Sequence, residues 1–108
     1  MKLVAKSLVL AALMGGAVNV AFAAGDAAAG QSKSAVCGAC HGADGNSMNP
    51  EWPKLSGQHA GYIAKQLADF KSGARLNDPA KVMENIAAKL SDDEIAALGG
   101  YFASRTRE

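Results

Sequence analysis

The sequence predicts an all-helical fold of about four short helices. Apolar side chains recur at helical spacing in the C-terminal half, and residues that start and stop helices border these segments. No stretch alternates apolar and polar residues as a half-buried strand does. The 108 residues, without an internal repeat, suit one small domain.

A signal peptide is predicted for residues 1–23. Two lysines give a positive start, residues 7–20 are mostly apolar, and Ala21-Phe22-Ala23 fits the A-x-A cleavage pattern. A transmembrane anchor is the alternative, but polar and glycine residues interrupt a run already shorter than the ~20 apolar residues of a span. We therefore expect export to the periplasm and a mature domain, residues 24–108, with no membrane span.

The mature composition leaves little material for a core. Removing 23 of the 108 residues leaves 85, with nine basic and ten acidic side chains, a balance that argues against nucleic acid as a partner. A chain of this size buries only about 60–65% of its unfolded surface. Five aromatic residues remain, namely Trp52, Tyr62, Phe70, Tyr101 and Phe102. We expect a large apolar group to complete the core.

Three helices and one long loop are predicted before the last helix. Asp26 caps a helix that runs through residues 26–36, up to the cysteines. Residues 42–58, rich in Gly, Pro and Asn, form a loop long enough to wrap a ligand. A helix follows over residues 60–72 and ends at Gly73. Pro79 then opens a short helix that ends at the Leu90/Ser91 junction.

The last helix has the clearest start. Residues 91–94, Ser-Asp-Asp-Glu, fit the S-x-x-E capping box, and apolar residues follow at helical spacing. Gly99 and Gly100 inside this helix each cost about 0.5–1 kcal/mol relative to alanine. Close approach of another backbone is therefore expected there.

One motif carries the chemistry. Residues 37–41, Cys-Gly-Ala-Cys-His, form C-x-x-C-H, the attachment sequence for c-type haem. Two thiols three positions apart can both reach the vinyl groups on one edge of a porphyrin, and the adjoining imidazole can then bind the iron. The small residues between the cysteines let the macrocycle lie against the backbone.

Three other uses of the cysteine pair compete with haem. A zinc site lacks a second ligand pair, because only His41 and His59 remain. A thioredoxin-like pair lacks the βαβ pattern around it. A disulfide that closes so tight a loop contributes little stability. Export and the helical pattern favour one covalently bound haem.

The sequence resembles class I cytochromes c over essentially the whole mature chain. The segments that carry the likeness, besides residues 37–41, are Gly25-Asp26 with Gly30, Gly42, residues 44–46 and 53–58, Tyr62 with Gln66-Leu67, Met83, residues 86–91 and Tyr101-Phe102. A single half of the bacterial tandem dihaem cytochromes c is the nearest likeness. The chain differs in having one such domain and in Gly99-Gly100, where the family more often has alanine or serine.

The resemblance implies a class I cytochrome c fold wrapped around one haem and a role for each motif residue. Cys37 and Cys40 would form the thioethers, His41 would be the proximal iron ligand and Met83 the distal one. The carbonyl of Pro53 would accept the His41 Nδ1–H and so fix the tautomer. Gly30 and Tyr101 would meet where the first and last helices cross.

From the residues alone, the distal ligand has three candidates. Met48 follows His41 by seven residues, at most about 24 Å of chain, and would use nearly the whole loop to cross the haem edge. Met83 has a helix and a turn in which to reach the opposite face. Core methionine is the ordinary alternative for Met83. His59 begins a helix and is expected to be solvated. Trp52 and Tyr62 are expected at the pocket wall or in the core.

These expectations predict a periplasmic one-electron carrier and not an enzyme. Methionine–histidine ligation favours a high reduction potential. Its partners would be redox proteins, such as a respiratory-chain donor, a terminal oxidase or a periplasmic reductase or dehydrogenase. A permanent haem subunit of a dehydrogenase is a second hypothesis, which a large apolar interface would favour. A peroxidase or gas-binding protein is a third and requires an open distal site.

Overall fold

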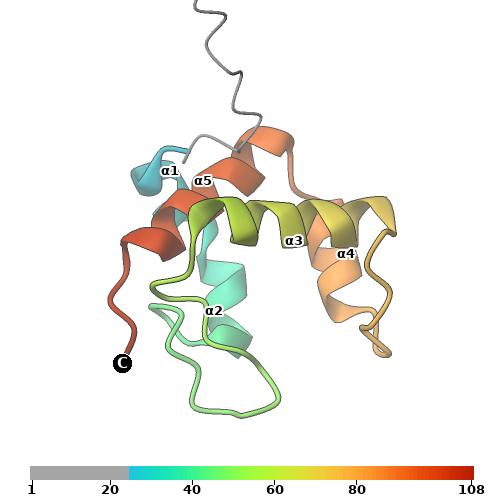
Figure 1. Cartoon of the computed structure of the whole chain (residues 1–108), viewed down its shortest axis with the longest axis horizontal. Coiled ribbons are helices and arrows are strands. Elements are labelled where there is room, and N and C mark those ends of the chain that lie inside the picture. The colour runs from blue at the N-terminus through green and yellow to red at the C-terminus, as the bar shows by residue number, and fades with distance from the viewer. Residues whose placement is uncertain (1–24) are drawn as a thin grey trace, which may run out of the picture.

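The computed structural model describes residues 25–108, which form five α-helices and no strand. The helices are α1 (Ala27–Lys33), α2 (Ala35–His41), α3 (Ala60–Ser72), α4 (Val82–Ala88) and α5 (Asp92–Ser104) (Figure 1). The predicted signal peptide, residues 1–23, lies outside the described residues. Within residues 25–108, no helix has the length and apolar character that crossing a membrane requires.

The first predicted helix is in fact two. Asp26 caps α1 as expected, with its Oδ1 accepting from the Ala28 N–H at 2.9 Å. The helix is interrupted at Ser34, whose hydroxyl donates to the Gln31 carbonyl at 2.8 Å. A serine that bonds back to the preceding turn competes with the helical ladder. The cysteines therefore lie on a separate helix, α2, and the count of about four helices becomes five.

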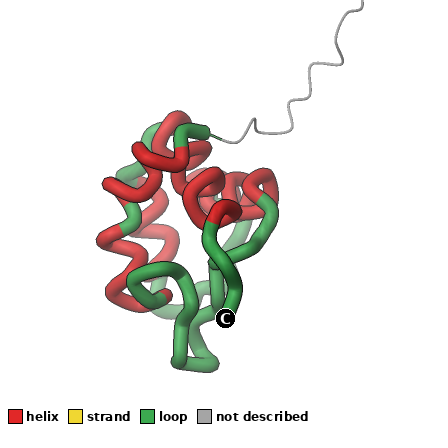
Figure 2. Tube along the Cα trace, turned by 90° about the vertical axis from the view of Figure 1, so that its left-hand side faces the viewer, coloured by secondary structure: helices red, strands yellow, loops and turns green. Residues whose placement is uncertain are grey.

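The predicted loop is confirmed. No helix or strand forms between Gly42 and His59, and Figure 2 shows this stretch as the long green turns at one end of the molecule. Gly45 anchors the loop, because its carbonyl accepts from the Leu55 and Ser56 N–H groups at 2.8 and 3.2 Å. Gly45 has φ 83°, and a Cβ there would lie 2.8 Å from a ring carbon of Phe102. The loop thus returns tightly against α5.

The helix α3 confirms its predicted bounds. Its buried residues are Ile63, Ala64, Leu67 and Phe70, which recur at helical spacing. Gly73 ends the helix at φ 80°, in the left-handed region that glycine adopts without a steric cost.

The helix α4 starts later than predicted. Pro79 does not open it, because Asp78 to Lys81 form a turn closed by a 2.8 Å bond from the Lys81 N–H to the Asp78 carbonyl. Proline is favoured at the second position of such a turn. The helix begins at Val82, and the Asp78 carboxylate accepts from the Met83 N–H at 2.5 Å.

The capping box at the start of α5 is confirmed. The Ser91 hydroxyl accepts from the Glu94 N–H at 3.1 Å, and the Glu94 carboxylate accepts from the Ser91 N–H at 3.0 Å. Close approach at the two glycines is also confirmed. A Cβ at Gly99 would lie 2.6 Å from the Ala60 carbonyl oxygen, and one at Gly100 would lie 2.3 Å from that of Gly25.

The core lies around α5, which packs against α1 on one side and α3 on the other. Its least exposed large side chains are Ile95, Leu98 and Phe102. Gly30 and Tyr101 meet at the α1–α5 crossing, where a Cβ on Gly30 would lie 2.7 Å from Tyr101 Cβ. Among the described helices, the backbone of α2 comes close only to α1 and that of α4 only to α3, while Cys37 and Ala87 join the core cluster.

Candidate haem site

The C-x-x-C-H motif occupies the C-terminal half of α2. Cys37 and Cys40 are one helical turn apart, both thiols are free, and both line one cavity together with His41. Cys37 and His41 are buried, whereas Cys40 is partly exposed. Residues three and four apart lie on the same side of a helix. The motif therefore presents two sulfurs and one imidazole to a single space.

The His41 ring is held in one orientation. Its Nδ1 lies 2.7 Å from the carbonyl oxygen of Pro53, the residue assigned to this contact from the resemblance. A carbonyl oxygen only accepts, so Nδ1 carries a proton, and in the neutral ring this tautomer leaves the lone pair on Nε2. Neutral imidazole with a free Nε2 is the form that binds a metal.

The cavity itself lies between α2, the 42–59 loop, α3 and α4. Its volume is about 890 Å³, near the upper end of the roughly 300–1,000 Å³ that cofactor sites span. Apolar side chains from every one of these elements line it, including Leu55, Ile63, Leu67 and Ile86. Trp52 and Tyr62 are at its wall, as the sequence suggested, and are 43% and 53% exposed.

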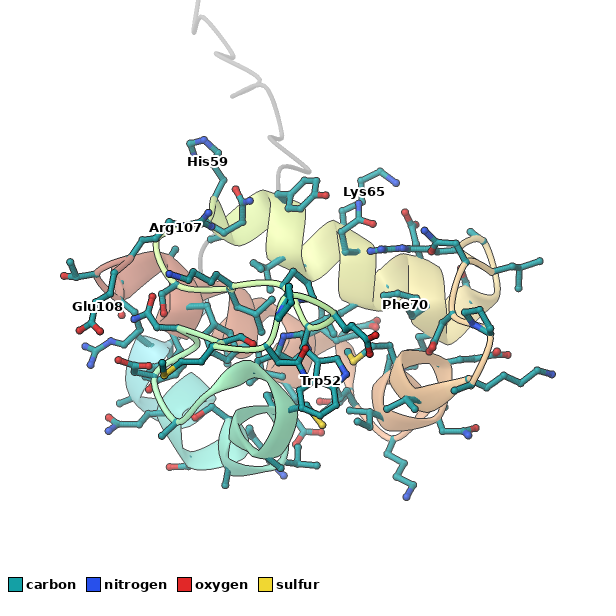
Figure 3. All side chains as sticks on the ribbon, turned by 90° about the horizontal axis from the view of Figure 1, so that it is seen from below. Trp52, His59, Lys65, Phe70, Arg107 and Glu108 are labelled. Carbon is teal, nitrogen blue, oxygen red and sulfur yellow. The ribbon has the colours of Figure 1, made fainter. Side chains whose placement is uncertain are left out.

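The three candidate distal ligands lie in different places. Met83 on α4 lines the cavity and packs partly buried against the core. Met48 is 99% exposed on the loop and is not among the residues that line the cavity. His59 is exposed and points outward from the start of α3 in Figure 3. Only Met83 of the three shares the cavity with His41.

Sequence reasoning missed Arg75 as part of the cavity wall. Its guanidinium lies 4.3 Å from the centre of the Phe70 ring and donates to Gln66 Oε1 at 2.9 Å. All three residues line the cavity. Arg75 follows the helix stop Gly73 in a segment without a motif, so nothing local in the sequence indicated its place.

The burial and the helix position of the cysteines argue against a thioredoxin-like redox pair. Burial raises the pKa of the Cys37 thiol above its usual value, although a backbone hydrogen bond partly opposes this effect. A reactive redox cysteine needs the opposite shift. The pair lies late in a helix of an all-helical domain, not at the start of a helix that follows a strand. The thioredoxin-like hypothesis therefore has no support in the geometry.

The donor set fits a covalently bound haem. Two thiols one turn apart, an imidazole with a fixed tautomer and an apolar cavity of suitable volume together define a c-type haem protein. A comparison with known families agrees, because the model named Cytochrome c matches residues 27–106. The chain belongs to the cytochrome c family, and its cofactor is haem c, with Cys37 and Cys40 fitting the attachment motif.

Individual relatives agree with this assignment. Cytochrome c4 of Pseudomonas aeruginosa is 51% identical over 100 residues, which cover 93% of this chain and 48% of that protein. Cytochrome c-554(548) of Halomonas halodenitrificans is 42% identical over 82 residues, which cover 76% of this chain and 99% of that protein. The chain thus spans about half the length of the cytochrome c4 it matches and nearly all of the shorter relative.

A solved structure confirms the predicted fold class. Reduced recombinant cytochrome c4 from Pseudomonas stutzeri aligns with a TM-score of 0.68 and 46% sequence identity, covering 79% of this chain and 48% of that chain. The all-helical class I cytochrome c fold expected from the sequence is therefore correct.

Proposed function

We propose that this chain is a periplasmic monohaem cytochrome c that carries single electrons between redox proteins and catalyses no reaction of its own. Cys37 and Cys40 hold the haem through thioethers, His41 is the proximal ligand and Met83 the distal one. One observation carries the proposal: both thiols, the oriented His41 ring and the Met83 side chain line the same cavity. Haem iron supplies a one-electron Fe(III)/Fe(II) couple when bound.

The chain's own residues suit a carrier. The bond from His41 Nδ1–H to the Pro53 carbonyl keeps the ring basic and in one orientation, so little has to move when the charge of the site changes. Met83 on the cavity wall would supply a second iron ligand and so limit access of small ligands. A peroxidase or gas-binding protein needs that position open, which makes this third hypothesis less suitable.

Access for partners is provided at the cavity edge. Val36, Trp52 and Val82 come from three different elements, line the cavity and are 51%, 43% and 45% exposed. A small apolar rim of this kind suits brief encounters that bury less than about 1,200 Å². The partners we propose are redox proteins, such as a respiratory-chain donor, a terminal oxidase or a periplasmic reductase or dehydrogenase.

The decisive experiment compares the wild-type holoprotein with Met83→Ala. Acidic acetone should leave haem on both chains, and the wild-type mass should equal the polypeptide from Ala24 onward plus one haem. Met83→Ala should lose the long-wavelength ferric absorption of a methionine–iron bond. It should also bind azide or CO readily and have a lower reduction potential, because the thioether stabilises Fe(II) relative to Fe(III).

Two matched variants control for nonspecific effects. Met48→Ala and His59→Ala alter the other candidate ligands and should keep the wild-type ferric spectrum. Retention of the absorption in Met83→Ala with its loss in Met48→Ala would show the distal assignment to be wrong. Extraction of haem by acidic acetone would contradict covalent attachment.

A further inference from the structure

We propose that Asp78 is the residue that positions Met83, by holding the first turn of α4 so that the methionine side chain stays at the haem cavity. This inference rests on the proposed distal role of Met83. The observation that carries it is a bridge, because the Asp78 carboxylate reaches over the intervening turn to accept backbone N–H groups of α4, and Asp78 itself lines the cavity.

The bridge has two parts. Asp78 Oδ2 accepts from the Met83 N–H at 2.5 Å and from the Glu84 N–H at 3.4 Å. The Asp78 carbonyl accepts from the Lys81 N–H at 2.8 Å. The side chain and the main chain of one residue therefore fix both the turn before α4 and the helix start.

The N-cap residue of α4 does not itself cap the helix. Lys81 stands at the N-cap position and its side chain makes no cap hydrogen bond. It has φ 55°, the one non-glycine residue with positive φ within the described chain. An L-residue reaches this region only when its surroundings compensate for the strain. Asp78 supplies that compensation, because its carbonyl holds the Lys81 N–H and its carboxylate holds the backbone two and three residues further on.

The position of Met83 depends strongly on this start because α4 has few other supports. The helix has seven residues, and among the described helices its backbone comes close to α3 alone. Isolated helices of this length are not stable in water. The Met83 N–H is one of the first-turn donors that have no intrahelical partner. Its bond to Asp78 is therefore the hydrogen bond nearest to the proposed ligand.

The test measures azide affinity of the ferric holoprotein, together with the methionine–iron absorption and thermal unfolding. Azide binds only when Met83 is off the iron, so its apparent affinity reports the open fraction. Loss of a typical cap should raise that affinity about fivefold in Asp78→Ala and weaken the absorption. Asp78→Asn keeps an acceptor of equal capping strength and should stay within about twofold of wild type.

Asp26→Ala is the matched control. Asp26 caps α1, which also has seven residues, through one bond from the Ala28 N–H, and it is not among the residues that line the cavity. Asp26→Ala should lower thermal stability and leave azide affinity and absorption unchanged. Should Asp78→Ala not accumulate as holoprotein, Asp78→Glu keeps the charge, displaces the acceptor by one methylene and should raise azide affinity by an intermediate amount.

Each other result overturns the proposal in a distinct way. Unchanged azide affinity in Asp78→Ala, or in Asp78→Glu where that variant replaces it, would show that Asp78 does not position Met83. Equal increases in Asp78→Ala and Asp78→Asn would assign the effect to the lost charge instead of the hydrogen bonds. Retention of the absorption in Met83→Ala would instead remove the proposed ligand itself, and the positioning role would fall with it.

Discussion

At the scale of single residues, glycines decide how closely α5 approaches its neighbours. Gly99 and Gly100 lie buried in the middle of this helix, although each weakens a helix in isolation. The structure shows why they are there. The carbonyl oxygens of Ala60 and Gly25 lie too close to the places where Cβ atoms on Gly99 and Gly100 would be. These oxygens belong to the backbone and cannot rotate away as a side chain can.

Gly100→Ala should therefore lower the free energy of unfolding by about 1–3 kcal/mol, the usual cost of overpacking a tight core. Gly61→Ala is the matched change in α3, where an added Cβ would meet nothing within 4 Å. It should raise the free energy of unfolding by about 0.5–1 kcal/mol. Urea titration of the two oxidised holoproteins measures both values. A Gly100→Ala protein as stable as Gly61→Ala would show that the α5 contact can relax.

At the scale of elements, the sequence predicted α3, α5 and the long loop well because their signals are local. Gly73 and the Ser91 capping box mark helix ends by chemistry within three or four residues. The break at Ser34 could not be foreseen, since a serine inside a helical pattern shows its bond to Gln31 only once folded. The start of α4 was misplaced because Pro79 fits a turn as well as a first helical residue.

The residues of the candidate site also differ in whether a local sequence signal indicated them. The cysteines and His41 were identified from one contiguous motif. The 2.7 Å contact with Pro53 spans twelve residues and was available only through the resemblance to class I cytochromes c. Arg75 and Asp78 reach the cavity through turns whose direction the local sequence does not encode. Long-range placement was thus predictable where a family pattern existed and not elsewhere.

Glu94 links two elements and makes the stability of their contact depend on pH. Its carboxylate accepts from the Ser91 N–H at the start of α5 and pairs with Lys33 at the end of α1, with Oε2 and Nζ 2.5 Å apart. These contacts, the Lys33 bond first, lower the pKa of Glu94 from 4.5 to about 2. A depressed pKa contributes stability that is present above pH 4.5 and is lost as the pH falls toward 2.

Glu94→Gln should therefore unfold at a lower temperature than wild type at pH 7, and the difference should shrink between pH 4.5 and 2. Glutamine keeps the capping-box acceptor, so the change removes mainly the charge that pairs with Lys33. Thermal unfolding of both holoproteins from pH 7 to pH 2.5 tests this. Asp93→Asn removes an exposed charge in the same turn and should follow the wild-type pH profile. A constant gap between Glu94→Gln and wild type would contradict the assignment.

At the scale of the whole molecule, the helices around the cavity differ in how many other helices they approach closely. The helix α5 packs against α1 and α3 and contributes Ile95, Leu98, Tyr101 and Phe102 to the core. By contrast, among the described helices the backbone of α2 comes close to that of α1 alone, and the backbone of α4 to that of α3 alone. The cavity of about 890 Å³ lies between these two helices, the 42–59 loop and α3. A haem bound there would contact all four of these elements.

The haem-free chain should consequently be largely unfolded. A domain of this size has little surplus stability, and a ligand that binds only the folded state adds its binding free energy to folding. The variant Cys37→Ser, Cys40→Ser, confirmed by mass to lack haem, should show low helicity by circular dichroism and no cooperative thermal transition. The helices α2 and α4 should be lost first, because each loses the surface that faces the cavity and keeps one helical neighbour. Native-like helicity with a sharp transition in this variant would show that the α1–α5–α3 core folds the domain without its cofactor.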